Sequence, residues 1–133
     1  MDDKARRISR IENFFSMLLT GKGISDHIFV GDSGLPPTTR EEWQSFVLVD
    51  VNQQTDYGAY STGSASIFLY ARPKGSGPTK NVALLDRMED ALDKAIEESH
   101  DKDYSIEENW RNAGYDSDRN FHYDVVNVSV TVR

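Results

Sequence analysis

The amino-acid sequence predicts an α+β fold, a two-layer sandwich with two helices packed on one face of an antiparallel or mixed sheet of about four strands. Three observations support this prediction. Two segments carry apolar residues at the spacing of amphipathic helices, and a long β-hairpin lies between them in the chain. Residues 126–133 alternate apolar and polar side chains, which is typical of a strand with one buried face.

Length and composition indicate a single α+β domain over residues 1–133. The formal net charge of −7 argues against nucleic-acid binding, which requires an excess of lysine and arginine. The chain lacks cysteine, so disulfides, thiolate nucleophiles and cysteine metal ligands are excluded, as is usual in a reducing cytoplasm. No apolar run approaches the ~20 residues that span a bilayer, so we expect no membrane partner.

The first predicted helix covers residues 3–20 and ends at Gly21 and Gly23. Its apolar side chains recur at spacings of three and four, and they are Ile8, Ile11, Phe15, Leu18 and Leu19. Its basic side chains are Lys4, Arg6, Arg7 and Arg10. We interpret the basic side chains as a solvated helix face and not as a nucleic-acid site.

The central part of the chain predicts strands. The short apolar run 28–30 precedes a loop, 31–37, in which two prolines preclude regular pairing. Residues 46–51 and 64–72 are rich in β-branched and aromatic residues and predict a hairpin. One face of its second arm consists of Ala65, Ile67, Leu69 and Ala71. The connection 52–63 exceeds the roughly two to five residues of a tight hairpin. Either the arms extend as an exposed ribbon, or the connection is a long polar loop.

The second predicted helix runs from Asn81, a suitable N-cap, to Glu98. Its apolar stripe consists of Val82, Leu85, Met88, Leu92, Ala95 and Ile96. Residues 99–119 are expected to be polar and irregular. Apolar anchors within them are Tyr104, Ile106, Trp110 and Tyr115. The last strand is expected to begin near Asn120, and its buried face carries Val126, Val128, Val130 and Val132.

The connection 52–63 is the candidate partner-binding segment, with Gln54, Tyr57 and Tyr60 as the candidate contact residues. Tyrosine offers a large contact area and tolerates water until a partner arrives, which suits a surface that must stay soluble before assembly. The alternative interpretation is a mobile, solvated loop, because glycine and serine also occur in this segment.

Two segments resemble enzyme motifs, but each lacks residues that the corresponding catalytic or phosphate-binding mechanism requires. Gly31–Pro36 spells most of the sequence around the nucleophile of trypsin-like proteases, but that layout needs a base and an orienting acid ahead of the serine. His27 is the only histidine ahead of Ser33, and it lies in the same local segment. Residues 75–80 lie where a phosphate-binding loop would lie, yet the glycine–lysine spacing is absent and Pro78 removes an amide donor.

No set of residues predicts a metal or cofactor site. Partial EF-hand spacings occur at Asp116, Asp118 and Asn120 and, more weakly, at Asp101 and Asp103. Both lack the required glycine and the final carboxylate, so we interpret them as solvated acidic loops. The histidines His27, His100 and His122 show no zinc spacing. The acids of the second helix, interpreted as a solvated face, are Glu89, Asp90, Asp93, Glu97 and Glu98. We therefore predict no catalytic residue, no cofactor and no enzymatic activity.

The order of elements resembles the tail terminator, or tail completion, proteins of long-tailed bacteriophages and related head–tail joining proteins. In that family, a helix like Val82–Leu92 follows the hairpin, and a strand like Tyr123–Val130 returns to the same sheet. Pro36 or Pro37 ahead of Trp43–Val49 is similar to the proline-containing loop that leads into the first long strand. The polar stretch 99–119 is longer than the family usually has at this place.

The resemblance implies a structural virion protein without catalytic residues. It implies a ring-shaped homo-oligomer, usually a hexamer, at the head–tail junction, present in the host cytoplasm during assembly and then in the virion. Its partners would be copies of itself and neighbouring neck or tail-tube proteins, contacted through long loops and hairpins. The alternatives are a non-viral α+β protein-binding module and, third, a small enzyme.

Overall fold

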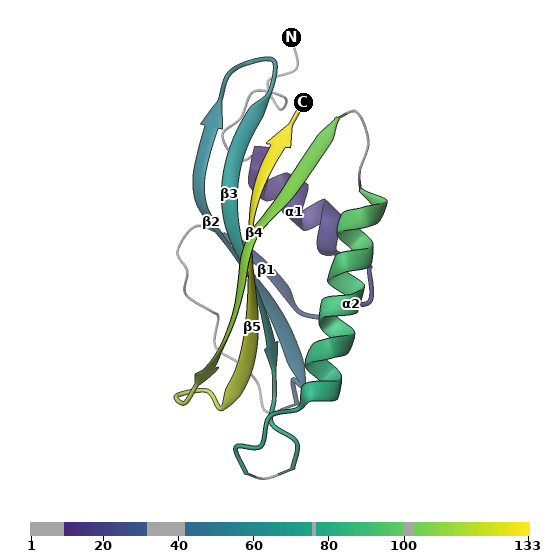
Figure 1. The fold of residues 1–133 in the computed structure, drawn as a ribbon, viewed down its shortest axis with the longest axis vertical. Helices are drawn as coiled ribbons and strands as arrows, with labels where there is room; N and C mark the ends of the chain where they lie inside the picture. Colours follow the sequence, from purple (N-terminus) through teal and green to yellow (C-terminus); the bar gives the residue numbers. More distant parts are fainter. Residues whose placement is uncertain (1–9, 32–41, 76, 100–102) are drawn as a thin grey trace.

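The computed structural model describes residues 10–31, 42–75, 77–99 and 103–133. Seven elements follow one another along the chain (Figure 1): α1 (Arg10–Leu19), β1 (Ile28–Gly31), β2 (Ser45–Asp56), β3 (Ser61–Ala71), α2 (Val82–Glu98), β4 (Tyr104–Asp116) and β5 (Phe121–Val132). The strands form one sheet in the order β1-β2-β3-β5-β4, in which β1 is parallel to β2 and the other pairs are antiparallel. The predicted α+β fold with a mixed sheet is confirmed, with five strands instead of about four.

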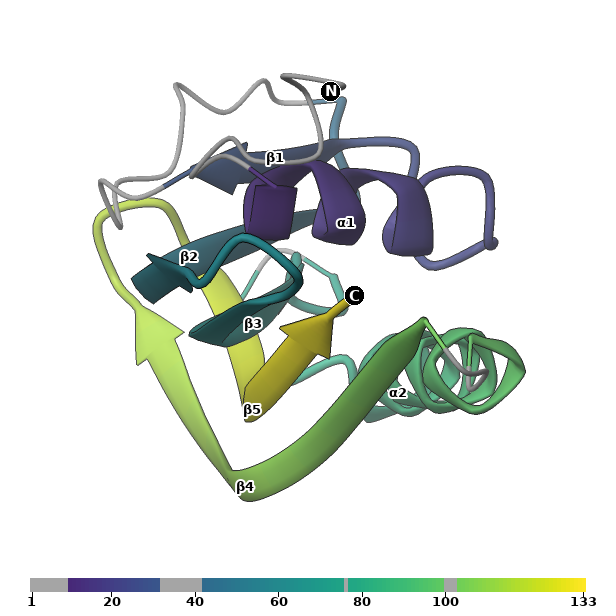
Figure 2. The same cartoon turned by 90° about the horizontal axis from the view of Figure 1, so that it is seen from above.

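Both helices cover the same face of the sheet, as predicted (Figure 2). We call this the inner face and the opposite one the outer face. The inner face of the sheet contributes mainly valine, isoleucine, leucine and alanine side chains from β2, β3 and β5 to the main core. The helices add Ile11, Phe14, Phe15, Leu18, Leu19, Leu85, Met88, Leu92 and Ala95. One continuous core therefore holds the two layers together.

The helices follow the predicted spacing except at Val82. This residue was predicted in the apolar stripe of α2, but it lies in the first turn of the helix and is 52% exposed. In α2, the Asn81 side chain accepts a hydrogen bond from the Leu84 amide at 3.2 Å, which confirms the N-cap. The described part of the first predicted helix runs from Arg10 to Leu19, and residues 3–9 lie outside the described residues. Gly21 and Gly23 follow it with φ of 75° and 77°, a conformation that glycine adopts without strain. No helix among the described residues is long and apolar enough to cross a membrane.

The predicted hairpin extends as a ribbon, which confirms the first of the two alternatives for residues 52–63. Strands β2 and β3 continue to Asp56 and Ser61, and only residues 57–60 connect them. The pattern in the sequence did not indicate these strand ends, because residues 52–56 and 61–64 carry no apolar alternation. An irregularity in the pairing between Val51 and Gln53 marks the place where the apolar part of β2 gives way to the polar part.

The prediction of an irregular segment over residues 99–119 is wrong, because most of it forms β4, a strand of 13 residues. Strand β4 lies at the edge of the sheet, and residues 107–113 are exposed, so no buried face imposes an apolar alternation on them. Ile106 is buried and the Tyr104 ring lies 4.8 Å from Phe14, so two predicted anchors are confirmed. Trp110 and Tyr115 are 48% and 42% exposed and lie outside both buried clusters, although the Tyr115 ring lies 4.5 Å from the His122 ring on β5.

The last strand is confirmed, although it begins one residue after Asn120, at Phe121. Strand β5 lies between β3 and β4, so it pairs along both edges. Its four inner-face valines, predicted from the alternation, are buried; they are Val126, Val128, Val130 and Val132.

The outer face carries a second, smaller apolar cluster at the end of the sheet that lies far from the β2–β3 connection. Its buried residues are Phe46, Leu48, Tyr70 and Phe121. The Phe46 and Tyr70 rings stack with centroids 4.2 Å apart, and the Arg72 guanidinium lies 4.5 Å from the centre of the Phe121 ring. Burial raises the pKa of the Tyr70 hydroxyl to about 12, with a smaller contribution from Asp116, so this tyrosine stays neutral.

Candidate functional site

The β2–β3 connection brings together two of the three predicted partner-binding residues. We call residues Tyr57, Gly58, Ala59 and Tyr60 the hairpin tip. The two tyrosine rings stack with centroids 5.0 Å apart, and 59% of Tyr57 and 39% of Tyr60 is exposed. The Tyr57 amide donates to the Tyr60 carbonyl at 2.8 Å, and Gly58 has φ of 89°. The glycine permits the tight turn that holds both rings at the end of the ribbon.

Hydrogen bonds fix the hairpin tip on the strands. The Asp56 carboxylate accepts bonds from the Gly58 amide at 2.8 Å and from the Ser61 hydroxyl at 3.4 Å. This pattern, in which an aspartate caps the amide two residues on, is a common way to stabilise a turn. The tip therefore forms a hydrogen-bonded turn between two paired strands, and residues 52–63 do not form a long irregular loop.

Helix α1 braces the ribbon below the hairpin tip. The Gln54 amide group donates to the Glu12 carboxylate at 2.9 Å, and the Arg10 guanidinium lies 3.5 Å from the Ser61 hydroxyl. Gln54, the third predicted partner-binding residue, is thus directed toward α1 and not toward the tip. It stiffens the ribbon, while the exposed contact area belongs to Tyr57 and Tyr60.

The outer face next to the hairpin tip consists of three rows of polar side chains that cross β2, β3, β5 and β4. Strand register places the residues of each row side by side. The rows are Thr55–Thr62–Thr131–Ser105, Gln53–Ser64–Ser129–Glu107 and Asp50–Ser66–Asn127–Trp110. We call them the polar rows. Asp50 and Glu107 are the only charged residues among these twelve.

A chain of hydrogen bonds connects the strands within the polar rows. It runs from Asp50 through Asn52, Ser66, Asn127 and Asn109 to Ser129. The Asn109 side-chain amide donates two of these bonds, at 2.9 Å to the side-chain oxygen Oδ1 of Asn127 and at 2.9 Å to the Ser129 hydroxyl. Asn52 and Asn109 stand where the strand register shifts, which leaves room for their side chains on the same face. The chain orders the side chains of this face across four strands.

A hollow of about 390 Å³ lies over the rows nearest the hairpin tip. It is lined by Gln53, Thr55, Tyr57, Thr62, Gly63, Ser64, Ser105, Glu107, Ser129, Val130 and Thr131. The lining is rich in hydroxyl groups, and Tyr57 joins it to the tip. Tip and polar rows therefore form one continuous surface.

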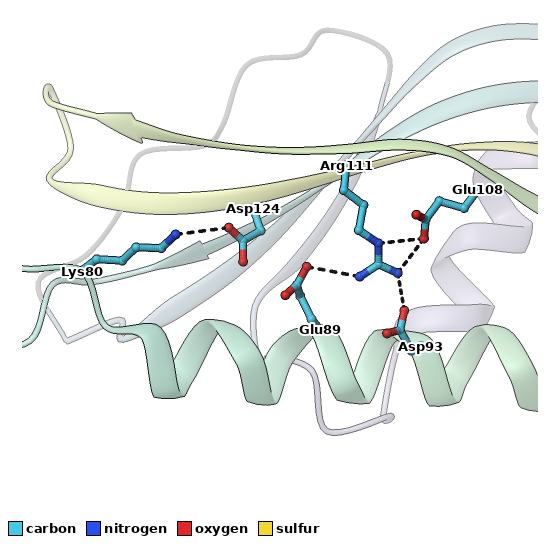
Figure 3. A network of polar contacts seen from close by, with 6 residues as sticks. All are labelled: Lys80, Glu89, Asp93, Glu108, Arg111 and Asp124. Atoms are coloured by element: carbon cyan, nitrogen blue, oxygen red, sulfur yellow. Dashed lines mark hydrogen bonds and ion pairs between the residues drawn. The ribbon is translucent and has the colours of Figure 1, made fainter.

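A cluster of charges lies on the inner side of β4, facing α2 (Figure 3). The Arg111 guanidinium contacts Asp93 and Glu108 at 2.6 Å and Glu89 at 3.2 Å. The bond to Glu108, followed by that to Asp93, raises the pKa of Arg111 despite its partial burial. Burial raises the pKa of Glu89, Asp124 nearby raises it further, and Arg111 acts in the opposite direction. The cluster fastens the edge strand to α2, and we assign it a structural role.

Other residues that the sequence analysis considered as ligands or catalytic groups make contacts that shape turns or pack rings. Asp116 accepts bonds from the amides of Asp118 and Arg119 at 3.1 and 3.2 Å and so shapes the β4–β5 turn, in which Asn120 has φ of 57°. The His27 ring stacks on Trp43 at 4.2 Å. The His122 ring nitrogen lies 2.6 Å from the Pro78 carbonyl oxygen, and Ser33, His100 and Asp101 lie outside the described residues. Within the described ranges, no group of three or more histidine, aspartate or glutamate residues could hold a metal ion.

Sequence reasoning found the tyrosines of the tip but missed the polar rows. Neighbours in a row come from strands far apart in the chain, such as Thr62 and Thr131. Their only local signal is the scarcity of charge in residues 51–55 and 61–71 of a chain with 28% charged residues. No protein-family model matches this sequence, and no curated protein matches it at significant similarity.

Proposed function

We propose that this protein is a structural virion protein of a tailed bacteriophage that forms a ring at the head–tail junction, as a tail terminator or a neck connector. The observation that carries the proposal is the hairpin tip, a hydrogen-bonded ribbon end with two exposed, stacked tyrosines. The order of elements, which resembles that of tail terminator and head–tail joining proteins, supports it. The ring is a homo-oligomer, with a hexamer as the expected size, and its other partners are neighbouring neck or tail-tube proteins.

The hairpin tip suits a contact between ring subunits. A cyclic ring requires a protrusion on one subunit to fit a different surface on the next. Tyrosines near the centre of such a contact supply much of the binding free energy, because they bury a large area at a small cost in side-chain entropy. The bonds from Glu12 and Arg10 hold the ribbon in one orientation before assembly. This reduces the entropy that is lost on binding.

The proposal includes the absence of enzymatic activity, of a cofactor and of a bound metal. The protein acts through surfaces, first in the host cytoplasm during assembly and then in the virion. Neither membrane nor sequence-specific nucleic acid is a partner in this proposal.

The experiment replaces residues 57–60 with Asn-Gly, which closes the ribbon between Asp56 and Ser61 by a tight two-residue turn. The shortened protein should keep its thermal stability and lose the ring, measured as native mass in multiples of 15.1 kDa and as incorporation into particles. A Tyr57→Phe and Tyr60→Phe double variant keeps the stacked rings and should still assemble. A shortened protein that still forms rings and enters particles at the wild-type level would falsify the role of the tip.

A non-viral protein-binding module is the second candidate, because a tyrosine-bearing tip next to a polar sheet face also suits recognition of a single partner. Native mass separates the two. A ring or incorporation into virions supports the first proposal, and a stable monomer bound to an unrelated protein supports the second.

A further inference from the structure

The polar rows have an unusual charge distribution for this protein. The chain carries a formal net charge of −7. Eight of its seventeen described acidic residues lie on α2 and around the β4–β5 turn: Asp86, Glu89, Asp90, Asp93, Glu97, Glu98, Asp116 and Asp118. The twelve residues of the polar rows include only two acids and no base. One of the two, Asp50, accepts a bond from Asn52, and the other, Glu107, lies on the edge strand.

This distribution favours a second copy of the chain as the occupant of the outer face. A basic partner would be attracted to the acidic surface of α2, whereas two copies of an acidic protein repel each other wherever their charges meet. Two such copies can approach through the polar rows, with two acids among twelve residues, with less repulsion than through α2, which carries six acids. Depletion of charged residues is also characteristic of the central part of protein interfaces.

The chemistry of the polar rows is complementary to itself. Serine and threonine hydroxyls and asparagine and glutamine amides each contain a donor and an acceptor, so a copy of the same face supplies partners for all of them. A face that meets its own copy does so about a two-fold axis. Trp110, 48% exposed at the end of one row, would bury its ring at the edge of this contact.

We propose that the polar rows form a two-fold contact with the polar rows of a second copy, with the axis near Ser64 and Ser129. These two residues lie at the centre of the middle row, on the central strands β3 and β5. The inference rests on the proposed self-assembly and adds a second surface to it. The hairpin tip joins neighbours within a ring, and the polar rows pair two subunits face to face.

The absence of native cysteine allows a direct test by cross-linking. Ser129→Cys places a thiol near the proposed axis, and Ala83→Cys places one on the exposed surface of α2. Facing sheets lie about 10 Å apart, beyond the reach of a disulfide, so a short bismaleimide is the suitable reagent. Ser129→Cys should form cross-linked dimers at least about tenfold faster than Ala83→Cys, because the contact raises the effective concentration of the thiols. Equal, slow cross-linking of the two variants would overturn the proposal.

A charge on the axis provides the second test. Ser129→Lys brings two like charges together across the contact and should weaken face-to-face association about tenfold or more, measured by sedimentation equilibrium of the full chain. Ala83→Lys changes the net charge by the same amount at a remote position and should leave association unchanged or strengthen it. Both positions are exposed, so both variants should keep the wild-type melting temperature. A wild-type chain that stays monomeric up to about 1 mM would show that the polar rows do not pair with a second copy, and the proposal is then wrong.

The two surfaces can fail separately. If Ser129→Lys leaves the native mass unchanged while the shortened hairpin lowers it, the paired-face inference is overturned and the proposed ring function stands. If Ser129→Lys reduces the assembly to a smaller one and the shortened hairpin has no effect, the face pairs two copies and the role of the tip is overturned.

Discussion

Gly63 on β3 lies directly against the backbone carbonyl of Gln53 on β2. A Cβ atom at Gly63 would stand 2.6 Å from that oxygen and 3.2 Å from the side chain of Ile11 on α1. The first neighbour is backbone and the second is a fully buried side chain, so neither can yield easily. The absence of a side chain at Gly63 therefore allows α1 to pack on the ribbon where β2 shifts its register.

Gly63→Ala should lower the free energy of unfolding by about 1–3 kcal/mol, the usual cost of forcing an extra methyl group into a filled space. Urea denaturation measures the change. Gly31→Ala is the matched control, because Gly31 also lies in a strand but its Cβ would meet nothing within 4 Å. We expect the control to stay within about 0.5 kcal/mol of the wild type. Equal effects of the two substitutions would contradict the proposed close packing of α1.

Val128→Asp should destabilise the protein by several kcal/mol, because Val128 has no exposed surface and a charge there would be removed from water without a partner. Ser129→Asp, at the exposed position next to it on the other face, should change the melting temperature little. Thermal unfolding followed by circular dichroism measures both. An unchanged melting temperature for Val128→Asp would show that the inner face of β5 is not buried.

Arg111→Met should lower the free energy of unfolding by about 1–2 kcal/mol at neutral pH, because Glu89, Asp93 and Glu108 lose the cation they share. The side chains are partly exposed, so solvent screening keeps this effect below that of a buried pair. Lys94→Met is the control. The Lys94–Glu98 pair is exposed and 3.9 Å apart, and its removal should have almost no effect.

The effect of Arg111→Met should depend on pH. The pKa of Glu89 is higher in the folded protein than in the unfolded chain, so protonation of Glu89 at low pH favours folding. This contribution to stability is lost as the pH rises from the ordinary glutamate pKa through the raised pKa of the folded state. Removal of Arg111 raises that pKa further, so the stability difference from the wild type should grow as pH rises through this window. Urea denaturation at about pH 4 and about pH 7 tests the sign. A difference that shrinks with rising pH would contradict the role assigned to Arg111.

Alanine at Ser33 and at His27 should leave biological function intact apart from ordinary effects on folding, because we propose that the protein has no catalytic site. His27 stacks on Trp43, so His27→Ala should cost some stability through the lost ring contact. The measurement is particle assembly, with the melting temperature of each variant as the control. Loss of assembly at unchanged stability would count against a non-enzymatic protein.

The sequence predicted those parts of the fold in which burial imposes a periodic pattern. The stripe of α2, the second arm of the hairpin and the valines of β5 each have one face in the core, and each was found where the structure has it. Strand β4 was missed because its residues 107–113 are exposed and its pairing with β5 needs no apolar side chain. The strand conformation of an exposed edge segment depends on its pairing with the neighbouring strand, and the local sequence pattern does not show which strand that neighbour is.

In the candidate site, too, the sequence indicated the features that depend on neighbours in the chain and missed those that depend on neighbours in space. Tyr57 and Tyr60 stand close together in the chain, so composition alone pointed to them. The polar rows depend on the register of four strands, and a slip of one residue in any of them would move its hydroxyl groups to the inner face. The direction of Gln54 toward Glu12 depends likewise on where α1 packs, which no local spacing indicates.

The position of β5 between β3 and β4 has a consequence for the order of folding. The hairpins β2–β3 and β4–β5 each join residues that are near in sequence, so they can form early. The residues that pair between β3 and β5 lie much farther apart in the sequence. Even the nearest pair, Ala71 and His122, is separated by 51 positions. Closing this loop costs entropy before any contact is gained, and α2 lies inside the loop. We therefore expect the docking of the two preformed hairpins, with α1 and α2 packing on the inner face that they form together, to limit the folding rate.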